Sequence, residues 1–188
     1  MKIVDIFAIV KGSLYSVQFD QNECDEFALA FRNWSDTEYL EDFFEKHKVD
    51  LQSGFYGDIT VEEAVFKTID EATDFEAKIK EVSENGNFDE ESSLQDLIFY
   101  PLHKNDKTFI LQESKAYGKK NKSWLRIYAI RINPQFYVVS GSAIKLTSDM
   151  GVQEHTKTEL SKLKITAAYL KEHGLMDDDD FGYIDFAI

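Results

Sequence analysis

The sequence predicts an α+β protein in which helices pack on one face of a curved antiparallel sheet of about four to six strands. Short runs rich in Val, Ile, Phe and Tyr, bounded by turn residues, occupy residues 2–19 and 108–146, as is typical of strands. Apolar residues recur every three or four positions in residues 23–48, 60–85 and 156–174, as is typical of helices. We expect three or four helices and a single domain over residues 1–188.

The N-terminal elements follow from local signals. Residues 2–10 and 14–19 read as strands, and Lys11-Gly12-Ser13 between them predicts a β-hairpin. Residues 23–48 then show helical spacing of Phe, Trp and Leu. The pair Ser35-Asp36 is expected to cap a second helix and so to divide this segment in two.

The central helix has a strong start signal. Thr60-x-x-Glu63 is a capping box, in which each side chain bonds the other residue's backbone N–H. An apolar stripe continues from Val61 to Val82, so we expect one long helix over this range. A short helix or turn follows and ends in Pro101-Leu102.

Three strands are expected next, over residues 108–113, 123–132 and 136–140, with the last open to extension as far as Leu146. Asn133-Pro134-Gln135 predicts a tight turn that makes the second and third strands an antiparallel hairpin. Thr156-x-x-Glu159 is a second capping box, and the last helix is expected to stop at Gly174. Gly141 is interpreted as a strand bend or bulge.

Composition restricts the compartment and the kinds of site. The 188 residues contain a single cysteine, Cys24, which excludes an internal disulfide and a metal site made of several thiols. The apolar run at the N-terminus is short and is interrupted by Asp5, so neither a signal peptide nor a membrane span is expected. We therefore expect a cytoplasmic protein that does not engage membranes.

Charge is distributed unevenly along the chain, whose formal net charge is −14. Residues 101–174 carry 13 Lys and Arg against 6 Asp and Glu, whereas residues 20–100 carry 6 against 23. Residues 175–188 add five acidic residues and no basic ones. A basic region within an acidic chain indicates an anionic partner for that region, inside or outside the molecule.

The order of motifs in residues 60–174 resembles that of RelE/HigB-type toxins of toxin–antitoxin modules. A long helix precedes a turn ending in Pro-Leu, then a strand ending Lys-Ala-Tyr-Gly, then Arg-Ile-Tyr-Ala-Ile-Arg. A strand leading into Gly-x-Ala-Ile-Lys and a Thr-x-x-Glu-capped helix complete the unit. Residues 1–58 would then be a hairpin and helical extension, and residues 175–188 an acidic tail.

This resemblance implies a ribosome-associated endoribonuclease that cleaves messenger RNA, encoded in a bacterial, mobile-element locus and inhibited by a small antitoxin protein. We expect no cofactor and no metal. Such chemistry needs a base, an acid and cations near the developing phosphate charge. The catalytic candidates are Arg126, Arg131, Lys145, Tyr128 and His155. The candidates for RNA binding are Lys115, Tyr117, Lys119, Lys120 and Lys122.

Each candidate also has a structural interpretation. Arg126 and Arg131 are five residues apart on one strand and are expected on opposite faces, with one paired to acidic helices. The structural interpretation of Lys119, Lys120 and Lys122 is a solvated hairpin tip. That of Tyr128 is core or cross-strand packing, and that of His155 is a surface residue just before a helix. The remaining histidines, His47, His103 and His173, are too scattered to predict a metal site.

Three functional classes therefore remain open from sequence. The first is the toxin-like endoribonuclease. The second is a non-catalytic RelE-like protein-binding module with an acidic arm, because a charge of −14 opposes docking on a polyanionic ribosome. The third is a nucleic-acid mimic, which requires the carboxylates to line one continuous face. The acidic segment either stands apart from the basic strands or covers them.

Overall fold

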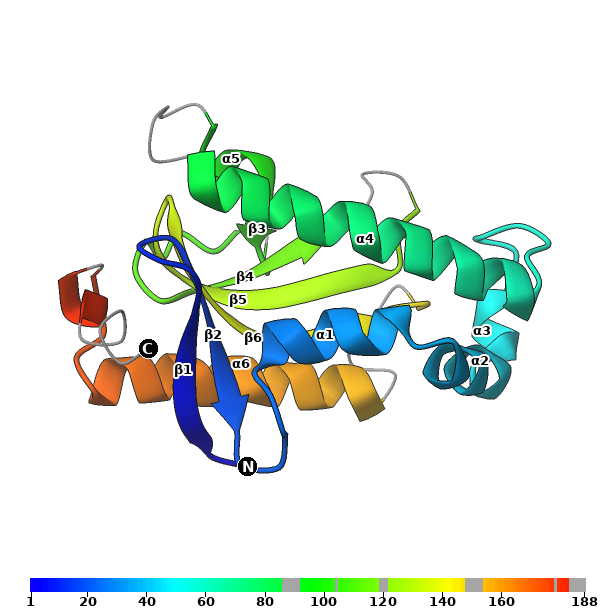
Figure 1. Cartoon of the computed structure of the whole chain (residues 1–188), viewed down its shortest axis with the longest axis horizontal. Helices are drawn as coiled ribbons and strands as arrows, with labels where there is room; N and C mark the ends of the chain where they lie inside the picture. Colours follow the sequence, from blue (N-terminus) through cyan, green and yellow to red (C-terminus); the bar gives the residue numbers. More distant parts are fainter. Residues whose placement is uncertain (86–91, 104, 119–121, 148–153, 178, 183–188) are drawn as a thin grey trace.

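The computed structural model describes residues 1–85, 92–103, 105–118, 122–147, 154–177 and 179–182; of residues 154 and 155 only the backbone is described. It is an α+β structure built around one six-stranded sheet of order β1-β2-β6-β5-β4-β3 (Figure 1). The strands are β1 (Ile3–Val10), β2 (Leu14–Phe19), β3 (Phe99–Pro101), β4 (Gln112–Tyr117), β5 (Leu125–Asn133) and β6 (Phe136–Ile144). The helices are α1 (Glu26–Ser35), α2 (Thr37–Lys46), α3 (Lys48–Leu51), α4 (Val61–Asn85), α5 (Leu94–Leu97), α6 (Glu154–Glu172) and the 3₁₀ turn η2 (Asp179–Phe181).

The sheet is mixed, which corrects the expectation of a wholly antiparallel one. The N-terminal hairpin joins the other strands through a parallel pairing of β2 with β6, over Leu14–Ser16 and Tyr137–Val139. All other pairs of neighbouring strands are antiparallel. A hairpin signal specifies how two strands meet each other, but it does not specify on which edge the pair adds to a sheet.

Helices cover both faces of the sheet, so the expectation that they share one face is also wrong. Figure 1 shows α4 on one side of the sheet and α6 on the other. One core cluster joins α1, α2 and α4 to Leu125, Ile127 and Ala129 of β5. The other joins Leu163 and Leu170 of α6 to the opposite face of the sheet. The strands β5 and β6 are therefore almost wholly buried.

Helix starts follow the capping signals. Asp25 Oδ1 accepts hydrogen bonds from the N–H groups of Phe27 and Ala28 at 2.9 and 3.1 Å. Asp36 separates α1 from α2 and accepts from Tyr39 N at 3.0 Å, as expected for the break in this segment. The first capping box is confirmed: Glu63 N donates to Thr60 Oγ1 at 3.2 Å, and Thr60 N donates to Glu63 Oε2 at 2.8 Å.

The strand expected over residues 108–113 is displaced. β4 instead spans Gln112–Tyr117, and the apolar residues Phe109 and Ile110 are 76% and 51% exposed. Leu111 has a positive φ of 54°, which ends the extended conformation immediately before β4. Apolar type alone placed this strand too early, because the buried positions of β4 are small or polar residues such as Ser114 and Ala116.

The C-terminal segment contributes to the core as well as carrying charge. Phe181 in η2 is fully buried, and its ring lies 4.7 Å from that of Phe136 and 5.1 Å from that of Tyr15. Asp180 Oδ2 accepts hydrogen bonds from the backbone of Met176 and Asp177. The part of the acidic tail before residue 183 is thus a packed turn, apart from residue 178, which lies outside the description. No helix among the described residues has the length and apolarity needed to span a membrane.

Candidate functional site

A pocket of about 570 Å³ lies where the ends of β4, β5 and β6 meet the loop after α3. We call it the cationic pocket. Among its lining side chains are three cations and one carboxylate. The lining consists of Asp50, Ser53, Phe55, Tyr56, Tyr117, Lys122, Ser123, Arg126, Lys145, Leu146 and Thr147. This composition suits an anionic ligand with an aromatic or sugar component.

Strand register brings these residues together. Tyr117, the last residue of β4, pairs with Arg126, which in turn pairs with Ala143 of β6. Lys145 follows the end of β6, and its backbone N–H donates to Trp124 O at 2.7 Å. Because β4 and β6 end at the same end of the sheet where the antiparallel β5 begins, the side chains there converge.

Arg126 is the central cation of the pocket. Its Nη1 donates to the carbonyl oxygens of Ser123 and Leu125 at 2.9 and 2.7 Å, and its guanidinium carbon lies 4.1 Å from the centre of the Tyr117 ring. Burial lowers the pKa of Arg126, and nearby tyrosines and Glu71 partly oppose this. An arginine nevertheless stays protonated at any physiological pH. Among the described residues it forms no ion pair, so its charge is available to a ligand.

Aromatic residues form the walls. Tyr56 Oη donates to Lys145 O at 3.1 Å, and its ring lies 5.1 Å from that of Trp124. The Nζ of Lys122 lies 5.6 Å from the centre of the Phe55 ring. Burial raises the pKa of Tyr56, so its hydroxyl remains a hydrogen-bond donor at neutral pH. Sequence reasoning missed Phe55 and Tyr56; the signal was an aromatic pair between Gly54 and Gly57, both at positive φ.

Two residues adjacent in sequence to the pocket lining, Gly118 and Trp124, pack against α4. Trp124 is fully buried, and its Nε1 donates to Thr68 Oγ1 at 2.9 Å. Gly118 follows β4 at a point where a Cβ would overlap the Glu71 carboxylate. Glycine here leaves room for the Glu71 carboxylate against the strand end, and a larger residue would displace that carboxylate. These contacts give the cationic side chains a rigid base.

Two of the catalytic candidates are placed elsewhere. Arg131 lies five residues further along β5, about 16 Å at the usual strand rise. It is buried, and its Nη1 donates to Phe109 O. Tyr128 is buried under α6, and burial raises its pKa strongly. Neither residue lines the cationic pocket.

The remaining candidates divide into two groups. Lys115 donates from Nζ to Leu102 O at 2.9 Å and lines a neighbouring pocket rather than the cationic one. His155 lies in the first turn of α6, but its side chain is outside the described part of the structure. Lys119 and Lys120 also lie outside the described residues. The structure thus brings together Tyr117, Lys122, Arg126 and Lys145.

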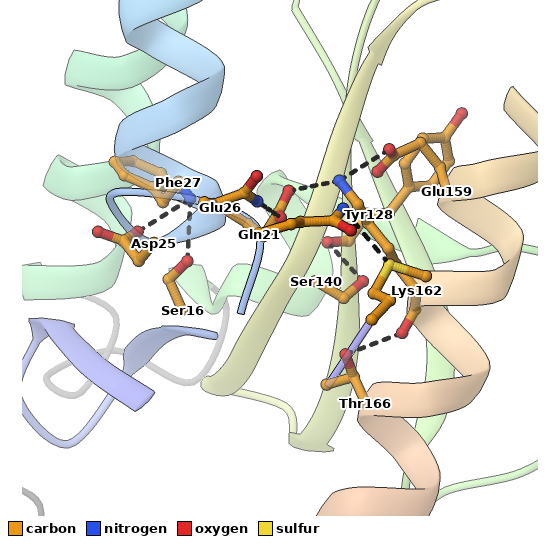
Figure 2. A network of polar contacts seen from close by, with 12 residues as sticks. Ser16, Gln21, Asp25, Glu26, Phe27, Tyr128, Ser140, Glu159, Lys162 and Thr166 are labelled. Carbon is orange, nitrogen blue, oxygen red and sulfur yellow. Dashed lines mark hydrogen bonds and ion pairs between the residues drawn. The ribbon is translucent and has the colours of Figure 1, made fainter. Parts of the chain in front are cut away.

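A second polar site was missed at the sequence level. Lys162 Nζ lies 2.8 Å from Glu26 Oε2 and 3.0 Å from Glu159 Oε1, deep between α1 and α6 (Figure 2). We call Glu26, Glu159 and Lys162 the acid–lysine cluster. Glu159 was expected to cap α6, but α6 begins earlier, at Glu154, and the Glu159 carboxylate turns to the sheet. The available signal was that Glu159 and Lys162 fall on the same helix face as Leu163 and Leu170.

Other chemistries find little support in the described residues. No group of three His, Cys, Asp or Glu side chains converges there in a way that would hold a metal ion. Ser140 is buried and its hydroxyl donates to Tyr128 O at 3.3 Å, so no base activates it as a nucleophile. Gly141 lies at the irregularity between β5 and β6, as its interpretation as a bulge requires. Comparisons with protein-family models, curated proteins and solved structures give no significant match to this chain.

Proposed function

We propose that the chain is a toxin-like endoribonuclease that cleaves messenger RNA at the ribosome, and that the cationic pocket holds the scissile phosphate. The observation that carries this proposal is the convergence of Tyr117, Lys122, Arg126 and Lys145 in one pocket. All of them come from the basic, RelE/HigB-like part of the sequence. A small antitoxin protein is the expected partner.

The pocket offers the groups that transesterification needs. Attack by a neighbouring 2′-hydroxyl places negative charge on the phosphate oxygens, and a fixed guanidinium stabilises that charge. We assign this role to Arg126, held in place by Tyr117 and two carbonyl oxygens. Lys122 and Lys145 contact flanking phosphates. We assign Asp50, the lining carboxylate, as the base that accepts the proton of the attacking 2′-hydroxyl. As the P–O5′ bond breaks and a 2′,3′-cyclic phosphate forms, the Tyr117 hydroxyl donates a proton to the leaving 5′-oxygen.

Burial of both sheet faces restricts how RNA can bind. An open basic sheet is not available, since α6 covers one face and α1 and α4 cover the other. RNA therefore meets the protein at the strand ends, where one or two nucleotides can enter. A single-stranded substrate fits this arrangement, because its bases can splay apart and stack on aromatic side chains such as Phe55.

The test is expression of the full chain in bacteria. We expect growth arrest and shortened messenger RNA half-lives, and Arg126→Ala should relieve both. Arg32→Ala is the matched control, because Arg32 is an exposed arginine on α1 far along the chain from the pocket. Normal growth with intact messenger RNA at equal expression of the wild type would contradict the proposal.

A second function is favoured by a different observation. An apolar pocket of about 590 Å³ lies between α4, α5 and β3, with Lys78 and Lys115 on its lining. Leu97 and Tyr100 beside it are each 41% exposed, although both are large and apolar. Such a surface suits a non-catalytic protein-binding module. In that case Leu97→Asp should abolish partner capture from the native host, and the purified chain should leave RNA intact.

A further inference from the structure

A third pocket, of about 610 Å³, lies beside the acid–lysine cluster, between α1, α2, α6 and the end of β6. Glu26, Glu159 and Lys162 all line it. It is distinct from the cationic pocket: β6 contributes Ser142, Ala143 and Ile144 here, whereas Lys145, Leu146 and Thr147 line the other. The proposed nuclease chemistry makes no use of it.

The cluster is deeply buried and its charges do not balance. Glu26, Glu159 and Lys162 are 1%, 6% and 7% exposed. Two carboxylates therefore share one ammonium group, at 2.8 and 3.0 Å. Buried charges in proteins are normally paired, so one negative charge remains to be compensated by a proton or by another cation.

One carboxylate oxygen of the cluster also lacks a hydrogen-bond donor. Glu159 Oε2 is buried and has no hydrogen-bond partner among the described residues. Burial raises the pKa of Glu159 to about 7, although the Lys162 ammonium opposes the rise. Burial likewise raises the pKa of Glu26. The cluster therefore takes up a proton near neutrality when nothing else neutralises it.

The backbone keeps the carboxylates in this arrangement. A Cβ at Gly141 would overlap Glu159 Oε2, so only glycine lets the carboxylate lie against β6. On the other side, Phe27 N donates to both Ser16 Oγ and Asp25 Oδ1 at 2.9 Å, which anchors the start of α1 next to Glu26 (Figure 2). The fold thus holds an unbalanced charge in place, instead of letting either glutamate turn to solvent.

We propose that this pocket binds a small organic cation, a primary ammonium or a guanidinium group, through Glu159 and Glu26. Such a group brings both the positive charge and the N–H donors that Glu159 Oε2 lacks. Trp34 and Phe43 on the lining add aromatic surface that favours a cation. A metal ion fits less well, because Lys162 occupies the space between the two carboxylates and repels it.

Binding is coupled to protonation. A bound cation takes the place of the proton on Glu159, so affinity should fall as the pH drops through the pKa of that carboxyl. Other titratable groups also face Glu159 or its pocket and enter the same equilibrium. Besides Lys162 they are Glu26 of α1, Tyr39, Asp42 and Lys46 of α2, His47 between α2 and α3, and Tyr128 of β5.

The experiment titrates the full chain with methylguanidinium or propylammonium chloride at constant ionic strength, using calorimetry and thermal stabilisation. We expect saturable binding at pH 8 that weakens about tenfold at pH 6, since protonation of Glu159 removes the charge that the ligand contacts. Glu159→Gln should abolish binding, whereas Glu41→Gln, an exposed carboxylate on α2 outside the pocket, should leave it unchanged.

A second variant tests the geometry. Gly141→Ala places a methyl group where Glu159 Oε2 lies, and should weaken binding at least tenfold, with Gly182→Ala as the control in open space. The proposal is overturned if neither probe binds at millimolar concentration, if Glu159→Gln binds as tightly as the wild type, or if sodium competes equally well. None of these outcomes bears on RNA cleavage, because Arg126→Ala should bind the probes normally.

Discussion

The acid–lysine cluster lies beside the end of β6 and the cationic pocket beside the residues that follow it, yet the two regions differ in how their charges are neutralised. In the cationic pocket Arg126 forms no ion pair among the described residues, and its charge faces a cavity. In the acid–lysine cluster every charge is buried and already shares an opposite partner, with one negative charge in excess. The comparison shows that this fold leaves positive charge exposed to ligands at the strand ends and buries negative charge beneath the helices.

The largest expected effect comes from removing the ammonium of the cluster. Lys162→Met leaves two buried carboxylates facing each other, and should lower the free energy of unfolding by about 3–5 kcal/mol. Urea denaturation at pH 8 measures this. Lys164→Met, an exposed lysine on the same helix, should change stability by less than about 0.5 kcal/mol. A Lys162→Met protein as stable as wild type would show that the cluster is not a coupled ion system.

The second-largest expected effect is a pH dependence of stability that comes from the acid–lysine cluster and not from the cationic pocket. The pKa of Glu159 is about 7 in the folded protein against an ordinary value of 4.5, so the folded state binds the extra proton between these values. The stabilisation that Glu159 gains from this proton is therefore complete below pH 4.5 and is lost as the pH rises through 7. Relative to Glu159→Gln, the wild type should lose about 2 kcal/mol of unfolding free energy between pH 5 and pH 8. Parallel pH profiles for the two proteins would contradict this assignment.

Removing a hydrogen bond between α4 and Trp124, next to the cationic pocket, should lower the stability by a smaller amount. Thr68→Val removes the acceptor for the Trp124 indole N–H and leaves that donor buried, which should cost about 1–2 kcal/mol of stability. Thr73→Val is the control, since Thr73 is exposed on the same helix and its hydroxyl donates to a backbone carbonyl in the same way. Equal losses in both variants would mean that the indole bond contributes nothing specific.

The smallest expected effect is on RNA affinity, when the planar guanidinium of Arg126 is replaced by the ammonium group of lysine. Arg126→Lys keeps the positive charge but loses the planar donor fork and the stacking on Tyr117. Affinity for a short single-stranded RNA should fall about tenfold, or about 1.4 kcal/mol. Filter binding at several salt concentrations should give the same salt dependence for both proteins, because the number of charges is unchanged. A change in that slope would place the effect on charge and not on geometry.

Local signals in the sequence were reliable where each element depends on its own residues. The hairpin of β1 and β2, the break at Asp36 and the Thr60–Glu63 cap all require only contacts within a few positions. The second capping box failed because Glu159 had a competing partner, Lys162, within the folded core. The strand before Tyr117 was misplaced because β4 buries small and polar residues that carry no strong strand signal.

In the candidate site, too, sequence patterns identified some residues, and only the tertiary structure identified or excluded the others. The basic run and its motif order pointed to ten candidate residues, and the fold placed four of them in one pocket: Tyr117, Lys122, Arg126 and Lys145. Arg131 could not be separated from Arg126 by residue type, since only the alternation along β5 and its burial place it elsewhere. Phe55 and Tyr56 come from a loop far away in sequence, and no local pattern links them to Arg126.

The sequence by itself determined the α+β class, most element boundaries and the concentration of positive charge in residues 101–174. Only the tertiary structure decided that β2 joins β6 in parallel, that α6 covers the second face, and that Glu26 and Glu159 meet at Lys162. The reason is physical. Propensity, capping and turn formation act within a few residues, whereas sheet order and buried ion pairs depend on contacts between residues as far apart as Glu26 and Lys162.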